Sequence, residues 1–201
     1  MIKIKYKRYY RLINTIITII LLLYINGITA CTTFAIQGIN TTTGDTYIGK
    51  NRDALGPYQH LAVRKDKDAI PYLGLFYSKN NKKPYPYISA GINQSGLTVV
   101  QNESVAIYNY QHFTNKDQST VIYTILKHYK SVKDVIAAQK LLFSNNEANF
   151  LIIADHKNAI MVEVGNKGGK YEILNAKNNN DILFHTNHYV LPKMRQLNTW
   201  Y

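Results

Sequence analysis

The stretch "ITACTTFAI", residues 28–36, contains the only cysteine of the chain, directly behind a hydrophobic segment. From residue 31 onward the side chains alternate between the two faces of a predicted strand, with Thr32, Phe34 and Ile36 on one face and Cys31, Thr33 and Ala35 on the other. We expect this strand to bury the first set and to present the second. Three roles are then open to the thiol: a lipid anchor, a catalytic nucleophile, or a buried side chain that only fills space in the core.

The first thirty residues differ from the rest of the chain. Residues 1–11, "MIKIKYKRYYR", carry five basic side chains and no acidic one, and residues 12–30 are almost uncharged, apolar and end in small residues. This order is typical of a secretory signal peptide. We therefore expect cleavage after Ala30, one domain over residues 31–201, and export to the periplasm or the extracellular space. A segment that is retained could instead just span a bilayer.

The composition limits the partners and cofactors. The chain of 201 residues carries 24 Lys and Arg against 12 Asp and Glu, but no basic run with interleaved aromatic residues follows residue 31, so we expect no nucleic-acid partner. One cysteine cannot form an intramolecular disulfide, and a lone thiol in an oxidising compartment is unusual unless it is used. The histidines show no convincing ligand spacing and no glycine-rich phosphate loop occurs, so we expect no metal and no cofactor.

The pattern of apolar residues predicts an α+β domain. Strands are expected in the first half at residues 31–38, 46–53, 60–65, 72–77, 85–91 and 97–103. Apolar residues spaced by three and four then predict helices at residues 117–131 and 131–144, with Ser119 and Ser131 as N-caps. Strands resume at residues 148–155, 159–165, 171–176 and 182–190, and the tail is expected to be a helix or a long loop. Strands on either side of a helical pair favour a layered α+β fold.

A cysteine that becomes the amino terminus has unusual chemistry. Its free α-amine lies beside its own thiol and can accept the thiol proton, so nucleophile and base come on one residue. Such a site also needs a group that holds the amine and donors for an oxyanion. Asp53 could hold the amine, and Asn102 and Asn187 could donate to the oxyanion. Each of them is also an ordinary turn former, so the residues alone do not select these roles.

Five motifs occur in a characteristic order: "CTTFAI", "GDTYIGKNRD", "AGINQSGLTVVQNES", "FLIIADHKNAIMVEV" and "FHTNHY". This order resembles that of the choloylglycine-hydrolase and penicillin-acyltransferase group of N-terminal nucleophile hydrolases. The "TNHY" element is more similar to the branch of acyl-coenzyme A:6-aminopenicillanic acid acyltransferase. The resemblance implies an αββα sandwich that cleaves or transfers non-peptide linear amides, such as conjugated bile salts, penicillins or N-acyl amino acids.

The resemblance also implies roles for individual residues. Cys31 matches the nucleophile, and Asp53 matches the aspartate that orients its amine. Lys50 stands where the group usually has an arginine that supports the thiolate. The positive charge is therefore kept, but the planar guanidinium group of arginine is lost. Asn102 matches the region that gives one oxyanion contact, and Asn187 matches the asparagine that gives the second.

Two alternatives compete with the enzyme. Residues 28–31 also resemble a bacterial lipobox, in which lipidation would consume the thiol; a polar tether usually follows such a cysteine, whereas a strand is predicted here, which favours the enzyme. Members of the group continue beyond "TNHY", so a shortened, inactive homologue is the second alternative. The expected partner is a small-molecule N-acyl amide, with a membrane added if Cys31 is lipidated or the leader is retained, and a homo-oligomer is left open.

Overall fold

The computed structural model describes residues 13–15, 31–52, 58–78, 87–102, 115–144, 148–165 and 169–198. Asp53 and almost all of the predicted leader lie outside these ranges. Within them, no helix combines the length and the apolar character that a membrane crossing requires.

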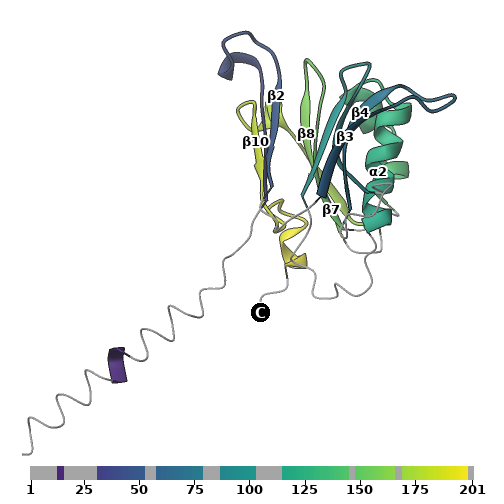
Figure 1. The fold of residues 1–201 in the computed structure, drawn as a ribbon. Helices are drawn as coiled ribbons and strands as arrows, with labels where there is room; N and C mark the ends of the chain where they lie inside the picture. Colours follow the sequence, from purple (N-terminus) through teal and green to yellow (C-terminus); the bar gives the residue numbers. More distant parts are fainter. Residues whose placement is uncertain are drawn as a thin grey trace, which may run out of the picture.

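Two antiparallel sheets form the centre of the molecule (Figure 1). The larger sheet has seven strands in sequence order, namely β3 (Tyr58–Arg64), β4 (Tyr72–Ser78), β5 (Tyr87–Asn93), β6 (Thr98–Asn102), β7 (Asn149–Ala154), β8 (Ala159–Val164) and β9 (Tyr171–Asn175). The smaller sheet has the order β10 (Ile182–His185), β1 (Thr32–Ile36) and β2 (Tyr47–Asn51). Every strand that the sequence pattern predicts is therefore confirmed, with ends that shift by a few residues.

The helices cover one face of the larger sheet (Figure 1). They are α2 (Asn115–His128), α3 (Val132–Ala137) and α4 (Gln139–Phe143), so the predicted second helix is divided at Ala138. Ser131 is confirmed as an N-cap, because its hydroxyl accepts a hydrogen bond from the Asp134 amide at 3.2 Å. The prediction for Ser119 is wrong: α2 already begins at Asn115, since the polar residues before Ser119 continue the helix.

Two hydrophobic cores lie on opposite faces of the larger sheet. The core under the helices contains, among others, Phe76, Ile88, Val99, Ile125, Phe143, Leu151 and Val162. The core between the two sheets contains Ala35, Phe150, Ile152, Met161, Leu183 and Tyr189 together with smaller residues. The described residues thus form three layers, helices on a sheet on a second sheet. As far as the structure describes it, the tail adds turns and one short 3₁₀ segment, Arg195–Leu197.

The face of β1 that is buried is opposite to the prediction. Thr33 and Ala35 are 1% and 0% exposed, whereas Phe34 is 39% exposed. The alternation is correct, but alternation alone does not say which face meets the core. The polar face is buried because it packs on the larger sheet, where Asn102 of β6 contacts the Thr33 hydroxyl. The same hydroxyl also contacts the main-chain oxygen of His185 on β10, the neighbouring strand of the smaller sheet. Phe34 and its cross-strand neighbour Phe184 lie on the outward face, which no helix of the described residues covers.

Candidate active site

The ends of three strands meet at Cys31. The cysteine directly precedes β1, which is the central strand of the smaller sheet, and its side chain is half-buried and in the free thiol form. β6 of the larger sheet ends at Asn102, and β10 ends at His185, just before Asn187. The fold therefore brings three of the predicted site residues, Cys31, Asn102 and Asn187, to one junction between the sheets.

Asn102 is completely buried and connects these strands. Its Nδ2 donates to the main-chain oxygens of His185 and Thr186, each at 3.0 Å. Longer contacts reach the Thr33 hydroxyl at 3.3 Å and the Cys31 main-chain oxygen at 3.4 Å. Since an amide nitrogen carries two hydrogens, the two short contacts account for its donor capacity. The side chain thus ties the end of β6 to the end of β10.

Lys50 supplies a positive charge at the same junction. It lies opposite Thr33 on β2, and its Nζ donates to the main-chain oxygen of Gln101 in the larger sheet. The ammonium group is therefore held one residue away from Asn102. Asn187 is 5% exposed and lies in the segment that follows β10. Asp53 lies just past β2, outside the described residues, so its position relative to Cys31 stays a prediction.

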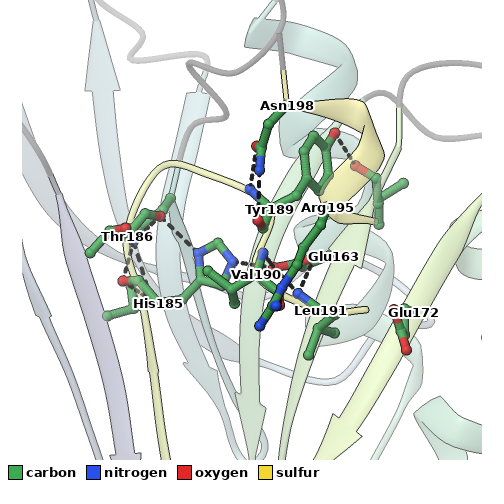
Figure 2. Close-up of polar contacts among 12 residues, drawn as sticks. Glu163, Glu172, His185, Thr186, Tyr189, Val190, Leu191, Arg195 and Asn198 are labelled. Carbon is green, nitrogen blue, oxygen red and sulfur yellow. Dashed lines mark hydrogen bonds and ion pairs between the residues drawn. The ribbon is translucent and has the colours of Figure 1, made fainter. Parts of the chain in front are cut away.

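A buried Glu163–His185 pair, which sequence reasoning missed, supports the junction (Figure 2). His185 Nε2 lies 2.7 Å from Glu163 Oε1, and the two side chains are 1% and 0% exposed. His185 Nδ1 donates to the Thr186 main-chain oxygen at 2.8 Å. Because that carbonyl can only accept, Nδ1 carries a proton, and a second proton lies between Nε2 and the carboxylate. The pair as a whole is thus neutral, which makes its burial tolerable.

The carboxylate of Glu163 also holds the chain that follows Asn187. Its Oε1 accepts the Val190 amide at 2.6 Å, and its Oε2 accepts the Leu191 amide at 3.1 Å. One sequence signal could have revealed it: "AIMVEV", residues 159–164, has a single charged residue in an otherwise apolar strand, and an ionisable residue is rarely buried without a partner.

The segment after β10 is fixed at its far end too. Asn198 and Tyr189 exchange two hydrogen bonds of 2.9 Å, in which the Tyr189 amide donates to Oδ1 and Nδ2 donates to the Tyr189 oxygen. The Tyr189 hydroxyl donates to the Val164 oxygen at 3.0 Å (Figure 2). Asn187 therefore sits in a short, restrained segment, as a group that must face a reacting atom would need. No cluster of three potential metal-ligating side chains occurs in the part of the chain that the structure describes.

The arrangement has the parts of a site for acyl transfer. A thiol stands at the junction, a cation is held nearby, and an amide is restrained on the adjoining segment. Thiol nucleophiles need activation by a base or a positive charge, and the tetrahedral intermediate of acyl transfer needs hydrogen-bond donors.

Comparisons with known proteins bear on the family and the fold. The model of the acyl-coenzyme A:6-aminopenicillanic acid acyl-transferase family matches residues 40–201. Among solved structures, a mutant of the conjugated bile acid hydrolase from Clostridium perfringens is similar with a TM-score of 0.52 and 19% identity, over 76% of this chain and 52% of that chain. Penicillin V acylase from Agrobacterium tumefaciens matches with a TM-score of 0.47 and 14% identity, over 76% of this chain and 51% of that chain.

The chain spans about half the length of these two solved proteins. A search among curated proteins gives no significant match. The predicted fold class is confirmed: the described residues form a helical layer and two sheets, which correspond to three of the four layers of the expected αββα sandwich. The match to the family model covers most of the sequence, so the chain belongs to the acyl-coenzyme A:6-aminopenicillanic acid acyl-transferase family, within the N-terminal nucleophile hydrolases.

Proposed function

We propose that the protein is an exported amidohydrolase or acyltransferase that uses an N-terminal cysteine on non-peptide linear C–N amide bonds. The observation that carries the proposal is the place of Cys31. It stands at the start of the central strand of the smaller sheet, where Asn102 joins β6 to β10 beside it. Family membership supports the same class of chemistry.

In the proposed reaction, removal of the leader frees the α-amine of Cys31. The amine takes the proton of the thiol, and the thiolate attacks the carbonyl carbon of the amide. The amine then gives the proton to the leaving nitrogen as the C–N bond breaks, which leaves a thioester. Water completes hydrolysis, or a second amine takes the acyl group in a transfer. Asp53 orients the α-amine, and the charge of Lys50 stabilises the thiolate.

The two asparagines have different proposed roles. Asn187 donates from its side chain to the oxyanion of the tetrahedral intermediate. Asn102 matches the oxyanion region by sequence, but its Nδ2 already donates to two main-chain oxygens. We therefore assign it a positioning role, in which it holds the end of β10 and with it Asn187. An Asn102→Asp variant would place an acceptor against those carbonyls and should lower kcat more than it changes KM.

The chemical state of Cys31 tests the proposal directly. Intact mass and N-terminal sequencing of protein recovered from the envelope fraction should give a chain that begins at an unmodified Cys31. A mass increased by lipid would favour an anchored envelope lipoprotein instead. A chain that still starts at Met1 would also contradict the mechanism, because the catalytic amine would not exist.

Activity is the second test. Hydrolysis of N-acyl amides, with a conjugated bile salt, a penicillin and an N-acyl amino acid as representatives, should be measured for the purified chain and for Cys31→Ser. We expect the variant to lose turnover, because a hydroxyl is a far weaker nucleophile than a thiolate at neutral pH. A Cys31→Ser protein with full activity would defeat the thiol mechanism.

A further inference from the structure

Arg52 directly follows β2, and Cys31 directly precedes β1, the strand that pairs with β2. The last register pair of the two strands joins Thr32 to Asn51, so the same register continued by one residue would place Arg52 opposite Cys31. Side chains alternate along β2, and Ile48 and Lys50 both point toward the larger sheet, where they meet the inter-sheet core and Gln101. Arg52 follows with the same parity and therefore points to the same side as the thiol.

A ring contact places the guanidinium of Arg52. Its Cζ lies 4.5 Å from the centroid of the Tyr77 ring, on β4 of the larger sheet. Tyr77 is 4% exposed, and its ring lies 5.4 Å from that of Tyr87 on β5. The guanidinium thus lies over an aromatic ring, a contact that leaves its N–H donors available to other partners.

The donors of Arg52 are not fully used. Its Nη1 is buried, yet it has no hydrogen-bond partner among the described residues. The ion pairs of those residues join other side chains, Lys127 with Asp66 and His185 with Glu163. Arginine stays charged in proteins, so a buried donor of this group that meets no acceptor is costly. An acceptor that arrives with a ligand would remove this cost.

We propose that Arg52 is a substrate-binding residue, which recognises a carboxylate close to the scissile amide. The planar guanidinium group fits a carboxylate through two parallel hydrogen bonds. This inference rests on the proposed function, because it places the substrate at Cys31. The carboxylate can belong to the amine part, as in an N-acylglycine, or to the acyl part, as in a glutaryl amide.

Pairs of substrates with and without a carboxylate test whether Arg52 recognises that charge. N-butanoylglycine is compared with its neutral primary amide, and an N-glutaryl amide with the N-pentanoyl amide of the same amine. For the charged member of one pair, Arg52→Met should raise KM by about ten- to a hundredfold and leave kcat within about twofold, as expected for a lost charged hydrogen bond. The KM of the neutral member should change little, and Arg52→Lys should retain part of the affinity for the charged member. The pair that responds identifies the side that carries the carboxylate.

Arg64 provides a matched control. Its Cζ lies 4.8 Å from the Phe76 ring, in the same kind of stacked contact, but on the helix-covered face of the larger sheet. Arg64→Met should leave both substrate pairs unchanged. Equal effects of Arg52→Met on charged and neutral substrates, or an equal effect of Arg64→Met, would overturn the assignment, because the loss would then not depend on the carboxylate.

A binding measurement separates this inference from the proposed function. The full chain with Cys31→Ala cannot turn over substrate, and N-acetylglycine and glutaramate serve as probes in an NMR titration. Binding of one probe, lost when Arg52→Met is added, supports the subsite even if the unsubstituted protein proves to be no amidase. Absence of binding by both probes, or binding that survives Arg52→Met, overturns the subsite whatever the activity.

Discussion

The two faces of the seven-stranded sheet bury different kinds of side chains. The face under the helices is packed with aliphatic and aromatic side chains. The face toward the smaller sheet also buries polar side chains, among them Thr33, Asn102, Glu163, His185 and Asn187. On β8 the two roles alternate along one strand, since Val162 joins the helix-side core and Glu163 binds His185. One side of the sheet thus holds a largely apolar core, whereas the other combines a smaller core with the buried polar residues of the candidate site.

Truncation of the helix-side core should have the largest effect on stability. Phe143 is fully buried, and its ring lies 5.7 Å from that of Tyr171. Phe143→Ala should lower the free energy of unfolding by about 3 to 5 kcal/mol, because it removes apolar area and leaves a cavity. Urea denaturation measures the loss. A loss below about 1 kcal/mol would mean that this layer is less tightly packed than its burial implies.

Removal of the Glu163 charge should affect both stability and the site. Glu163→Gln leaves the second proton of the pair without its carboxylate, and we expect a loss of about 3 kcal/mol, as for other broken buried pairs. Glu172 is the control: it is the cross-strand neighbour of Glu163 on β9, and its Oε2 accepts the Lys193 amide at an exposed position. Glu172→Gln should cost no more than about 1 kcal/mol. Equal losses in urea denaturation would contradict the importance of the buried Glu163–His185 pair.

Ionisation of Tyr72, which is buried on the helix-covered face, should lower the stability of the protein. Burial, helped by the Asp66 carboxylate, raises the pKa of Tyr72 to about 12 from its usual 10. The neutral phenol therefore contributes stability that is fully present below pH 10 and is lost as the pH rises toward 12. The loss should reach roughly 2 kcal/mol, since one pKa unit corresponds to about 1.4 kcal/mol. Tyr72→Phe should lose less stability over this pH range when both proteins are followed by urea denaturation.

One substitution made in both sheets gives the smallest and sharpest comparison. A Cβ on Gly91 would lie 2.6 Å from Leu126 Cδ1 and 2.9 Å from the Leu73 main-chain oxygen, which cannot move aside. Gly91→Ala should therefore cost about 1 to 3 kcal/mol. A Cβ on Gly49 would meet only the ring of Phe34, which is partly exposed and can turn outward. Gly49→Ala should cost about 1 kcal/mol or less. The reverse order in thermal denaturation would contradict this account.

The strands and the Ser131 cap could be predicted because each depends on residues that are close in sequence. Alternating apolar residues predicted the strands, and the N-cap of Ser131 involves only the amide three residues later, that of Asp134. The buried face of β1 was not predictable in this way, because it depends on which sheet β1 packs against. Motif order pointed to Cys31, Asn102 and Asn187, which the fold brings together. The bonds of Asn102 to His185 and Thr186, and that of His185 to Glu163, depend on strand pairings that no local pattern contains.

The position of β1 between β2 and β10 sets the order in which the site can assemble. β2 follows β1 after a short loop, but the pairing of Thr33 with His185 joins residues that are 152 positions apart. Contacts between such distant residues form late, since the intervening chain must first be ordered. The larger sheet, whose strands pair with their neighbours in sequence, can form first and act as a template. We therefore expect the surroundings of Cys31 to be completed last, once β10 has docked beside the strand that the cysteine precedes.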